Sequence, residues 1–130
     1  MARAVWPLLH DRPIVSVSIL PLAGQPIQRN LLADTGAGTA KVGFDLLLEV
    51  NDCLACRRVS AKPVVLGGAY SGTFPVFVIR VQILSLGFDR LVRSVGVPQI
   101  PAGFGGIAGF RFLSRFTYGN FGVSNQFGLE

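Results

Sequence analysis

The sequence has few of the residues that most catalytic and metal sites use. Among 130 residues there are one histidine, two cysteines, and seven acidic residues against twelve basic ones. A serine–histidine–aspartate triad would have to use His10, which lies beside Asp11 and Arg12 in a segment that we expect to be solvated. The acidic residues are scattered along the chain. We therefore predict that the protein binds no metal and needs no cofactor.

Long apolar runs are also missing. No stretch approaches the ~20 apolar residues that a membrane-spanning helix needs, so no membrane partner is expected. The run Ala4–Leu9 is too short for the apolar part of a signal peptide and contains Pro7. The compartment stays open, with the cytoplasm as the default expectation. Half of the residues are hydrophobic and only 15% are charged, which excludes a disordered chain and fits one domain.

The cations and the cysteines also exclude some functions. The net charge of +5 comes from ten arginines and two lysines, with one adjacent pair, Arg57-Arg58. Nucleic-acid-binding proteins gather such cations with aromatic residues on one face, so no nucleic-acid partner is expected. Cys53 and Cys56 form one C-x-x-C, which supplies only two of the four ligands of a zinc site. They are expected to be reduced thiols near a turn, since a thioredoxin-like βαβ setting is missing.

What the chain has is a pattern of short strands and glycine-rich turns. Residues 13–20 alternate between apolar and polar, and 27–33 return as a second strand, which predicts a hairpin that delivers Asp34 to a tight turn. Residues 42–50 are ambiguous between strand and helix, and Asn51-Asp52 are expected to end them.

The second half of the sequence predicts a longer hairpin and a helix. Further strands are expected at 64–66, 74–84 and 91–97, with strand-like residues at 118–127. The glycine-rich segment 67–72 forms the tip of the hairpin, and 98–105 form a loop. Apolar residues at helical spacing over 109–116 predict one short amphipathic helix. The expected fold class is mostly β, with one short helix near the C-terminus.

Three segments carry a resemblance to a known family. Asp34-Thr35-Gly36-Ala37 follows an apolar strand and resembles the active-site motif of the aspartic proteases. The segment 65–74 looks like the glycine-rich flap hairpin of retroviral-type proteases. The segment Gly106–Leu113 is similar to the apolar-apolar-Gly element that precedes their helix. The order of these elements over residues 13–121, with a single D-T-G, resembles one protomer of a retropepsin-like aspartic protease.

The resemblance implies a fold, an assembly and a set of site residues. The fold is a closed β-barrel of the acid-protease type over 13–121, between an N-terminal arm (1–12) and a C-terminal tail (122–130). The last two residues of the tail resemble vector residues and are given no weight. The protein is expected to be a homodimeric endopeptidase that cleaves polypeptides. The implied site comprises the catalytic Asp34, the supporting loop residues Thr35, Gly36 and Ala37, the flap residues Gly67, Gly68, Ala69 and Tyr70, and the pocket residue Ile107.

Physical chemistry leads to the same dimer. Hydrolysis by carboxyl groups alone needs one ionised group as base and one protonated group as acid. Because this chain has one such aspartate, a second copy has to supply the other across a two-fold axis. In the resembled family the threonine hydroxyls bond across that axis, which assigns Thr35 to the interface. Gly36 lets the backbone approach the carboxylate closely.

The sequence also departs from the family pattern. Retroviral enzymes commonly place an aspartate after D-T-G-A and pair it with an arginine after the apolar-apolar-Gly element. Here these positions hold Gly38 and Phe110, so that ion pair is missing and the dimer has to rest on other contacts. Lys41 stands where an apolar residue is usual, and Ala108 is small.

Other interpretations of the same residues stay open. Asp34-Thr35-Gly36 is also a common turn sequence, in which case the β fold is a non-catalytic module for peptide binding or dimerisation. The segment 34–44 further resembles the phosphate-binding hairpin of actin-like ATPases, in which Lys41 would hold nucleotide phosphates. That fold needs two large domains and a second Asp-Gly loop, for which this chain is too short.

Overall fold

The computed structural model describes residues 2–39 and 41–130, and 49% of the chain lies in strands against 11% in helices. The strands are β1 (Ala4–Pro7), β2 (Ile14–Leu20), β3 (Ile27–Ala33), β4 (Leu46–Glu49), β5 (Val59–Leu66), β6 (Gly72–Ile83), β7 (Phe88–Val97), β8 (Gly106–Ala108), β9 (Tyr118–Gly119) and β10 (Gln126–Leu129). The helices are α1 (Val50–Cys56), the 3-10 turn η1 (Leu84–Leu86) and α2 (Phe110–Leu113). The expected mostly-β class is confirmed.

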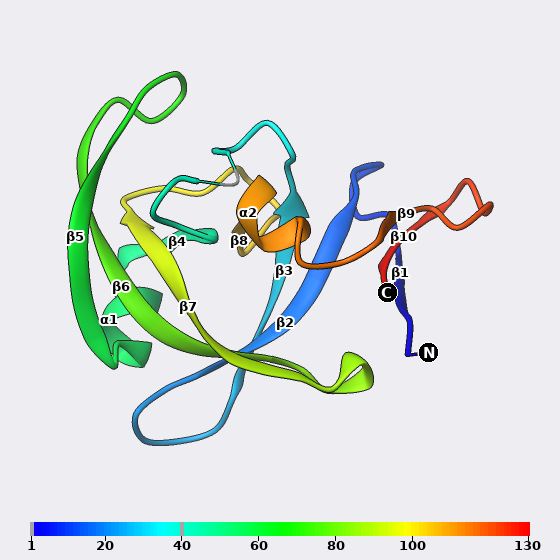
Figure 1. Cartoon of the computed structure of the whole chain (residues 1–130), viewed down its shortest axis with the longest axis horizontal. Helices are drawn as coiled ribbons and strands as arrows, with labels where there is room; N and C mark the ends of the chain where they lie inside the picture. Colours follow the sequence, from blue (N-terminus) through cyan, green and yellow to red (C-terminus); the bar gives the residue numbers. More distant parts are fainter. Residues whose placement is uncertain (1, 40) are drawn as a thin grey trace.

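Six strands close into a barrel. The large sheet runs in the order β2-β3-β8-β4-β7-β6-β5, and a further pairing of β2 with β6 joins the two ends of the first six strands. Strand β5 lies outside this ring and pairs only with β6. The two form a long curved hairpin whose tip stands at one end of the barrel (Figure 1). A cleft lies between that tip and the end of β3.

The alternation in the sequence predicts the first hairpin correctly. β2 and β3 pair antiparallel from Ile14↔Leu32 to Ile19↔Ile27. Val15, Val17 and Ile19 point into the barrel and are fully or almost fully buried. Burial of each such aliphatic side chain stabilises the fold by about 1.5–3 kcal/mol relative to an exposed one.

The segment 42–50, ambiguous between strand and helix, contains the strand β4, which ends at Glu49 just before Asn51-Asp52. Asn51-Asp52 then lie in the first turn of α1, an α-helix that the sequence did not predict beside α2. Glu49 caps this helix, because its Oε2 accepts a hydrogen bond from the Asn51 backbone at 3.1 Å. Cys53 and Cys56 lie on the inner face of this helix and are fully buried, whereas the sequence placed them near a turn. Asp and Asn favour the first turn of a helix as much as a turn, so residue type alone was ambiguous.

The helix expected near the C-terminus is present but shorter than its apolar spacing suggested. α2 covers four residues, and Phe112 and Leu113 are fully buried beneath it. Phe112 packs edge-on against Phe88, with ring centroids 5.6 Å apart, and Phe116 contacts both rings. These three rings fix α2 to β7. Among the described residues, no helix has the length and apolar character needed to cross a membrane.

The two terminal segments pair with each other. β1 and β10 run antiparallel, with Ala4 opposite Leu129, and β9 covers the other edge of β10 (Figure 1). Leu129 is fully buried in the main core and belongs to the fold, although the last two residues resemble vector residues in the sequence. Both edges of β10 are therefore occupied within one chain.

A buried carboxylate holds α2 against the barrel. Asp45 is 1% exposed. Its Oδ1 lies 2.9 Å from Arg115 Nη2 and 3.6 Å from Arg111 Nε, and its Oδ2 accepts a hydrogen bond from the Arg93 backbone at 3.0 Å. The Asp45 backbone carbonyl accepts a further bond from Gly109 N at 2.9 Å. Each polar atom of this buried group thus has a partner, as burial requires.

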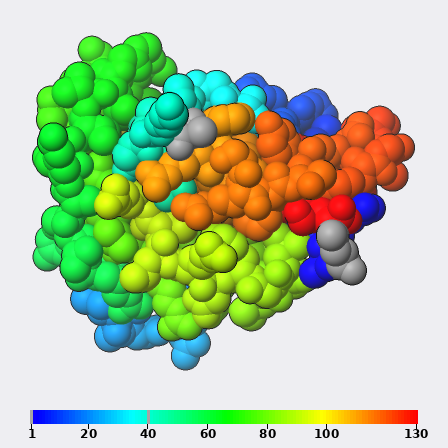
Figure 2. Space-filling view, viewed as in Figure 1, coloured from blue at the N-terminus to red at the C-terminus, as the bar shows by residue number. Residues whose placement is uncertain are grey.

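The same helix also fixes the loop between β3 and β4. Arg111 donates to the Val42 carbonyl at 2.7 Å, and the Phe110 backbone donates to the Ala37 carbonyl at 2.9 Å. Figure 2 shows the segment of this helix, in orange, beside the cyan segment that follows β3. Through these contacts α2 holds the loop at both Ala37 and Val42.

Replacement of Asp45 by alanine is expected to destabilise the fold. Charge-assisted hydrogen bonds contribute roughly 1.5–3 kcal/mol each, so Asp45→Ala should lower the free energy of unfolding by about 2 kcal/mol or more. Denaturation by urea, followed by tryptophan fluorescence, measures this change. The matched control is Asp89→Ala, which removes an exposed carboxylate bonded to Arg80. Equal losses in the two variants would contradict the structural role of Asp45.

Candidate functional site

The end of β3 positions Asp34. β3 runs parallel to β8, with Leu32 opposite Ile107 and Ala33 opposite Ala108, and the Asp34 backbone continues the ladder by donating to the Ala108 carbonyl at 3.0 Å. The chain then turns, because the Asp34 carbonyl accepts a bond from Ala37 N at 3.1 Å. A rigid strand therefore carries the carboxylate up to the point where the backbone leaves the barrel.

The turn leaves little room for larger residues. Asp34 Oδ1 accepts a hydrogen bond from Gly36 N at 2.9 Å, and a Cβ on Gly36 would lie 3.2 Å from that oxygen. A Cβ on Gly109 would lie 2.9 Å from the Ala37 carbonyl oxygen. Thr35, by contrast, is exposed, and its hydroxyl has no hydrogen-bond partner within residues 2–39 and 41–130. The turn thus fixes Asp34 and leaves the threonine facing outward.

Most of the residues implied by the resemblance lie around one cavity. A cleft of about 780 Å³ opens between the Asp34 turn and the tip of the β5–β6 hairpin. Its lining includes Asp34, Gly36, Ala37, Gly67, Gly68, Ala69, Tyr70 and Ile107. Ile107 belongs to β8 and Leu47 of β4 lies beside it on the floor. Thr35 is the one implied residue that the lining does not include.

The hairpin tip is anchored to the opposite side of the cleft. The Tyr70 hydroxyl donates to the Gln99 carbonyl at 2.9 Å, and its ring meets Phe74 edge-on. Burial raises the pKa of Tyr70, so the phenol keeps its proton at neutral pH and remains a donor. Gly68 has φ of +70° with open space around it, so the tip can change shape there at little cost. One hydrogen bond therefore ties the hairpin tip to the Gln99 side of the cleft.

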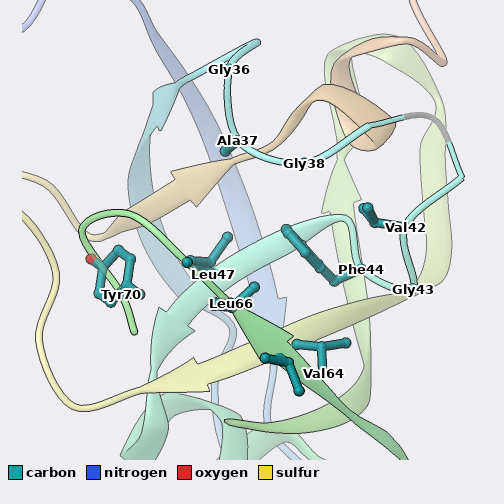
Figure 3. A pocket seen from close by; sticks show the side chains of 12 residues that line it. Gly36, Ala37, Gly38, Val42, Gly43, Phe44, Leu47, Val64, Leu66 and Tyr70 are labelled. Carbon is teal, nitrogen blue, oxygen red and sulfur yellow. The ribbon is translucent and has the colours of Figure 1, made fainter. Parts of the chain in front are cut away.

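A second, apolar cavity of about 490 Å³ extends the cleft away from Tyr70 (Figure 3). Phe44 and Leu47 on the β4 side face Val64 and Leu66 of β5 across it. The two cavities share the Asp34 turn and the start of the hairpin tip, including Gly36, Ala37, Leu47, Gly67 and Tyr70. Together they form one continuous groove beside the carboxylate, with an apolar lining suited to side chains of an extended peptide.

Several groove residues were missed at the level of the sequence. The segment 99–102 was expected only as a loop, yet Gln99, Ile100, Pro101 and Ala102 form the rim opposite the hairpin tip. Leu47 and Leu66 are ordinary strand residues by pattern. The sequence carries no signal for Leu47, and that for Leu66 is the odd spacing of apolar residues on each side of a β5 bulge between Ala61 and Val64, which the strand register shows.

Comparisons with family models, curated proteins and solved structures give no match. In the described part of the chain, no three histidine, cysteine or carboxylate side chains come together as metal ligands would. The function therefore has to be inferred from the residues around Asp34.

The two cysteines are expected to be chemically inert in the folded protein. Burial raises the pKa of the Cys53 thiol to about 11 and also raises the pKa of Cys56. The thiolate is the reactive form, so almost none is present near neutral pH. Iodoacetamide should leave the native protein unmodified and alkylate both thiols after unfolding in guanidinium, as mass spectrometry measures. Rapid alkylation of the native protein would show that α1 opens or that the thiols are activated.

Proposed function

We propose that this protein is an aspartic endopeptidase that acts as a homodimer. The observation that carries the proposal is the placement of Asp34, at the end of a rigid strand and on the wall of a mostly apolar groove beneath a glycine-rich hairpin. Such a groove has the shape and apolar lining to hold an extended polypeptide beside the carboxylate. The resemblance of the D-T-G-A, flap and apolar-apolar-Gly segments to retropepsin-like proteases supports the same activity.

One chain supplies half of the acid–base pair. Asp34 is the one carboxylate in the lining of the groove. Asp45 is buried in its arginine contacts, and Asp52 is paired with Arg29 at 2.8 Å, so neither is free to act. The second carboxyl group is the Asp34 of another chain, and the exposed Thr35 beside it is the natural contact at the two-fold axis.

In the proposed reaction one aspartate accepts a proton from water and the other donates the proton that it carries. The ionised Asp34 takes a proton from water, whose oxygen attacks the peptide carbonyl carbon, while the protonated Asp34 of the partner donates its proton to the carbonyl oxygen. The tetrahedral adduct then breaks its C–N bond. The nitrogen leaves as an amine after it receives a proton from the first aspartate, and the adduct hydroxyl returns a proton to the second.

The dimer predicted here cannot be built by adding a strand to β10. Both edges of β10 are already occupied by β1 and β9 of the same chain. The contact has to involve the Asp34 turn itself together with side-chain faces such as Val5, which is 44% exposed.

The first test of the proposal is assembly. Thr35→Ala should weaken the dimer by about tenfold, since it removes a hydrogen bond made twice, at about 0.5–1.5 kcal/mol each. Sedimentation equilibrium of the wild type and the variant measures this change. Thr73→Ala, an exposed threonine on β6, is the control that should leave the dimer intact. A monomer that still cleaves peptides through Asp34 would overturn the shared site.

The second test is the role of Asp34 in cleavage. Asp34→Asn should abolish peptide hydrolysis and keep the fold, because it preserves the side-chain oxygen that Gly36 N contacts. The wild-type rate should follow a bell in pH, because only the singly protonated pair has both a base and an acid. Cleavage of a peptide library across a pH series, followed by mass spectrometry, checks both expectations. Activity retained by Asp34→Asn would overturn the catalytic role of Asp34, whereas a wild type that cleaves no peptide would leave the peptide-binding module as the alternative.

A further inference from the structure

A third cavity continues the groove at its far end. It measures about 460 Å³ and lies along residues 59–64 of β5, next to Val78 and Arg93. It shares Gly43 and Val64 with the apolar cavity. In Figure 3 these two residues lie at the end of the apolar cavity away from Tyr70. The groove therefore runs from Asp34, through an apolar section, to this third cavity.

The third cavity differs from the other two in its charge. Lys62 and Arg93 line it, both are exposed, and no carboxylate belongs to its lining. In the described part of the chain neither cation forms an ion pair, whereas Arg29, Arg80 and Arg115 each contact an aspartate. Two positive side chains without a protein partner among the described residues thus share one hollow, at the far end of a groove whose one other charged lining residue is Asp34.

The backbone at Arg93 is held in place, and the backbone at Lys62 leaves the regular strand pairing. Arg93 N donates to Asp45 Oδ2 at 3.0 Å, and its carbonyl accepts from Asp45 N at 2.8 Å. The carboxylate of Asp45 is therefore occupied and buried, and it does not reach the hollow. On β5 the register shifts between Ala61 and Val64, a bulge that turns Lys62 out of the regular ladder.

We propose that this hollow binds an acidic side chain, aspartate or glutamate, of the substrate polypeptide. The inference rests on the proposed endopeptidase function and names the substrate that the groove selects. The acidic residue is separated from the cleaved bond by the residues that fill the apolar cavity. The charge complementarity is local, since a carboxylate in the hollow meets two cations and no competing carboxylate.

The expected selectivity is modest and depends on salt. Exposed ion pairs in water contribute little individually, so the two cations together should favour an acidic residue over its amide by about three- to tenfold. The preference should shrink as salt is added, because exposed charges are screened.

The test uses an octapeptide library with the wild-type dimer and cleavage sites read by mass spectrometry. Aspartate and glutamate should be enriched at one position away from the cleaved bond. The double variant Lys62→Gln/Arg93→Gln should lose this enrichment and still cleave. Arg90→Gln is the matched control, because Arg90 lies on the same strand as Arg93 at odd spacing and so faces the other side of β7. Cleavage without acidic enrichment, or enrichment that survives the double variant, overturns the acidic subsite and leaves the endopeptidase intact.

A binding measurement separates the two proposals. Asp34→Asn leaves the third cavity unchanged. The peptides of the same library that bind to this variant should be enriched in acidic residues. The enrichment should disappear when Lys62→Gln and Arg93→Gln are added to Asp34→Asn. If the wild type cleaves nothing, the endopeptidase proposal fails, and retention by Asp34→Asn still decides the subsite. Retention without acidic enrichment overturns it.

Discussion

The three residues of β8 determine where the rest of the barrel can go. This strand lies between β3 and β4, parallel to the first and antiparallel to the second, so a segment distant in sequence separates two consecutive strands and pairs with both. The fit is tight, since a Cβ on Gly106 would come within 2.6 Å of Leu48 Cδ2 and 2.8 Å of the Leu47 carbonyl oxygen. Glycine is thus required for the backbones to approach. The ladder from Ala108 to Asp34 depends on this pairing, so the barrel and the carboxylate are positioned by one contact.

The sequence predicts those parts of the fold whose patterns are local. Alternation marked β2 and β3, a glycine-rich tip marked the β5–β6 hairpin, and helical spacing marked α2. The helix α1 was missed because the residues of its first turn are also turn formers, and only Glu49 and the buried face of Cys53 decide between the two. The pairing of β8 with β3 and β4 could not be predicted, because a three-residue apolar segment does not specify which strands it pairs with.

The candidate site, like the fold, could be predicted only in part. Asp34 and the glycines of the hairpin tip could be found in the sequence, because a carboxylate directly after an apolar strand and a glycine-rich turn both form local motifs. The walls of the groove are not, since Leu47 and Val64 are the residues that any strand carries. Asp45 was hidden for another reason: its partners Arg111 and Arg115 lie on a different element, and three-dimensional contact alone shows that they meet.

The distribution of charge sets Asp34 apart from the other carboxylates. In the part of the chain that the structure describes, five ion pairs join arginines to acidic residues, and Asp45 takes part in two of them. Asp45 is buried against Arg111 and Arg115, and Arg111 also donates to the Val42 carbonyl in the loop that follows Asp34. Asp45 therefore places no carboxylate on the groove wall. Among the residues that line the three cavities, Asp34 is the one acidic residue. An acid–base pair in this groove would need its second carboxyl group from outside the chain, which is why the proposed activity rests on assembly.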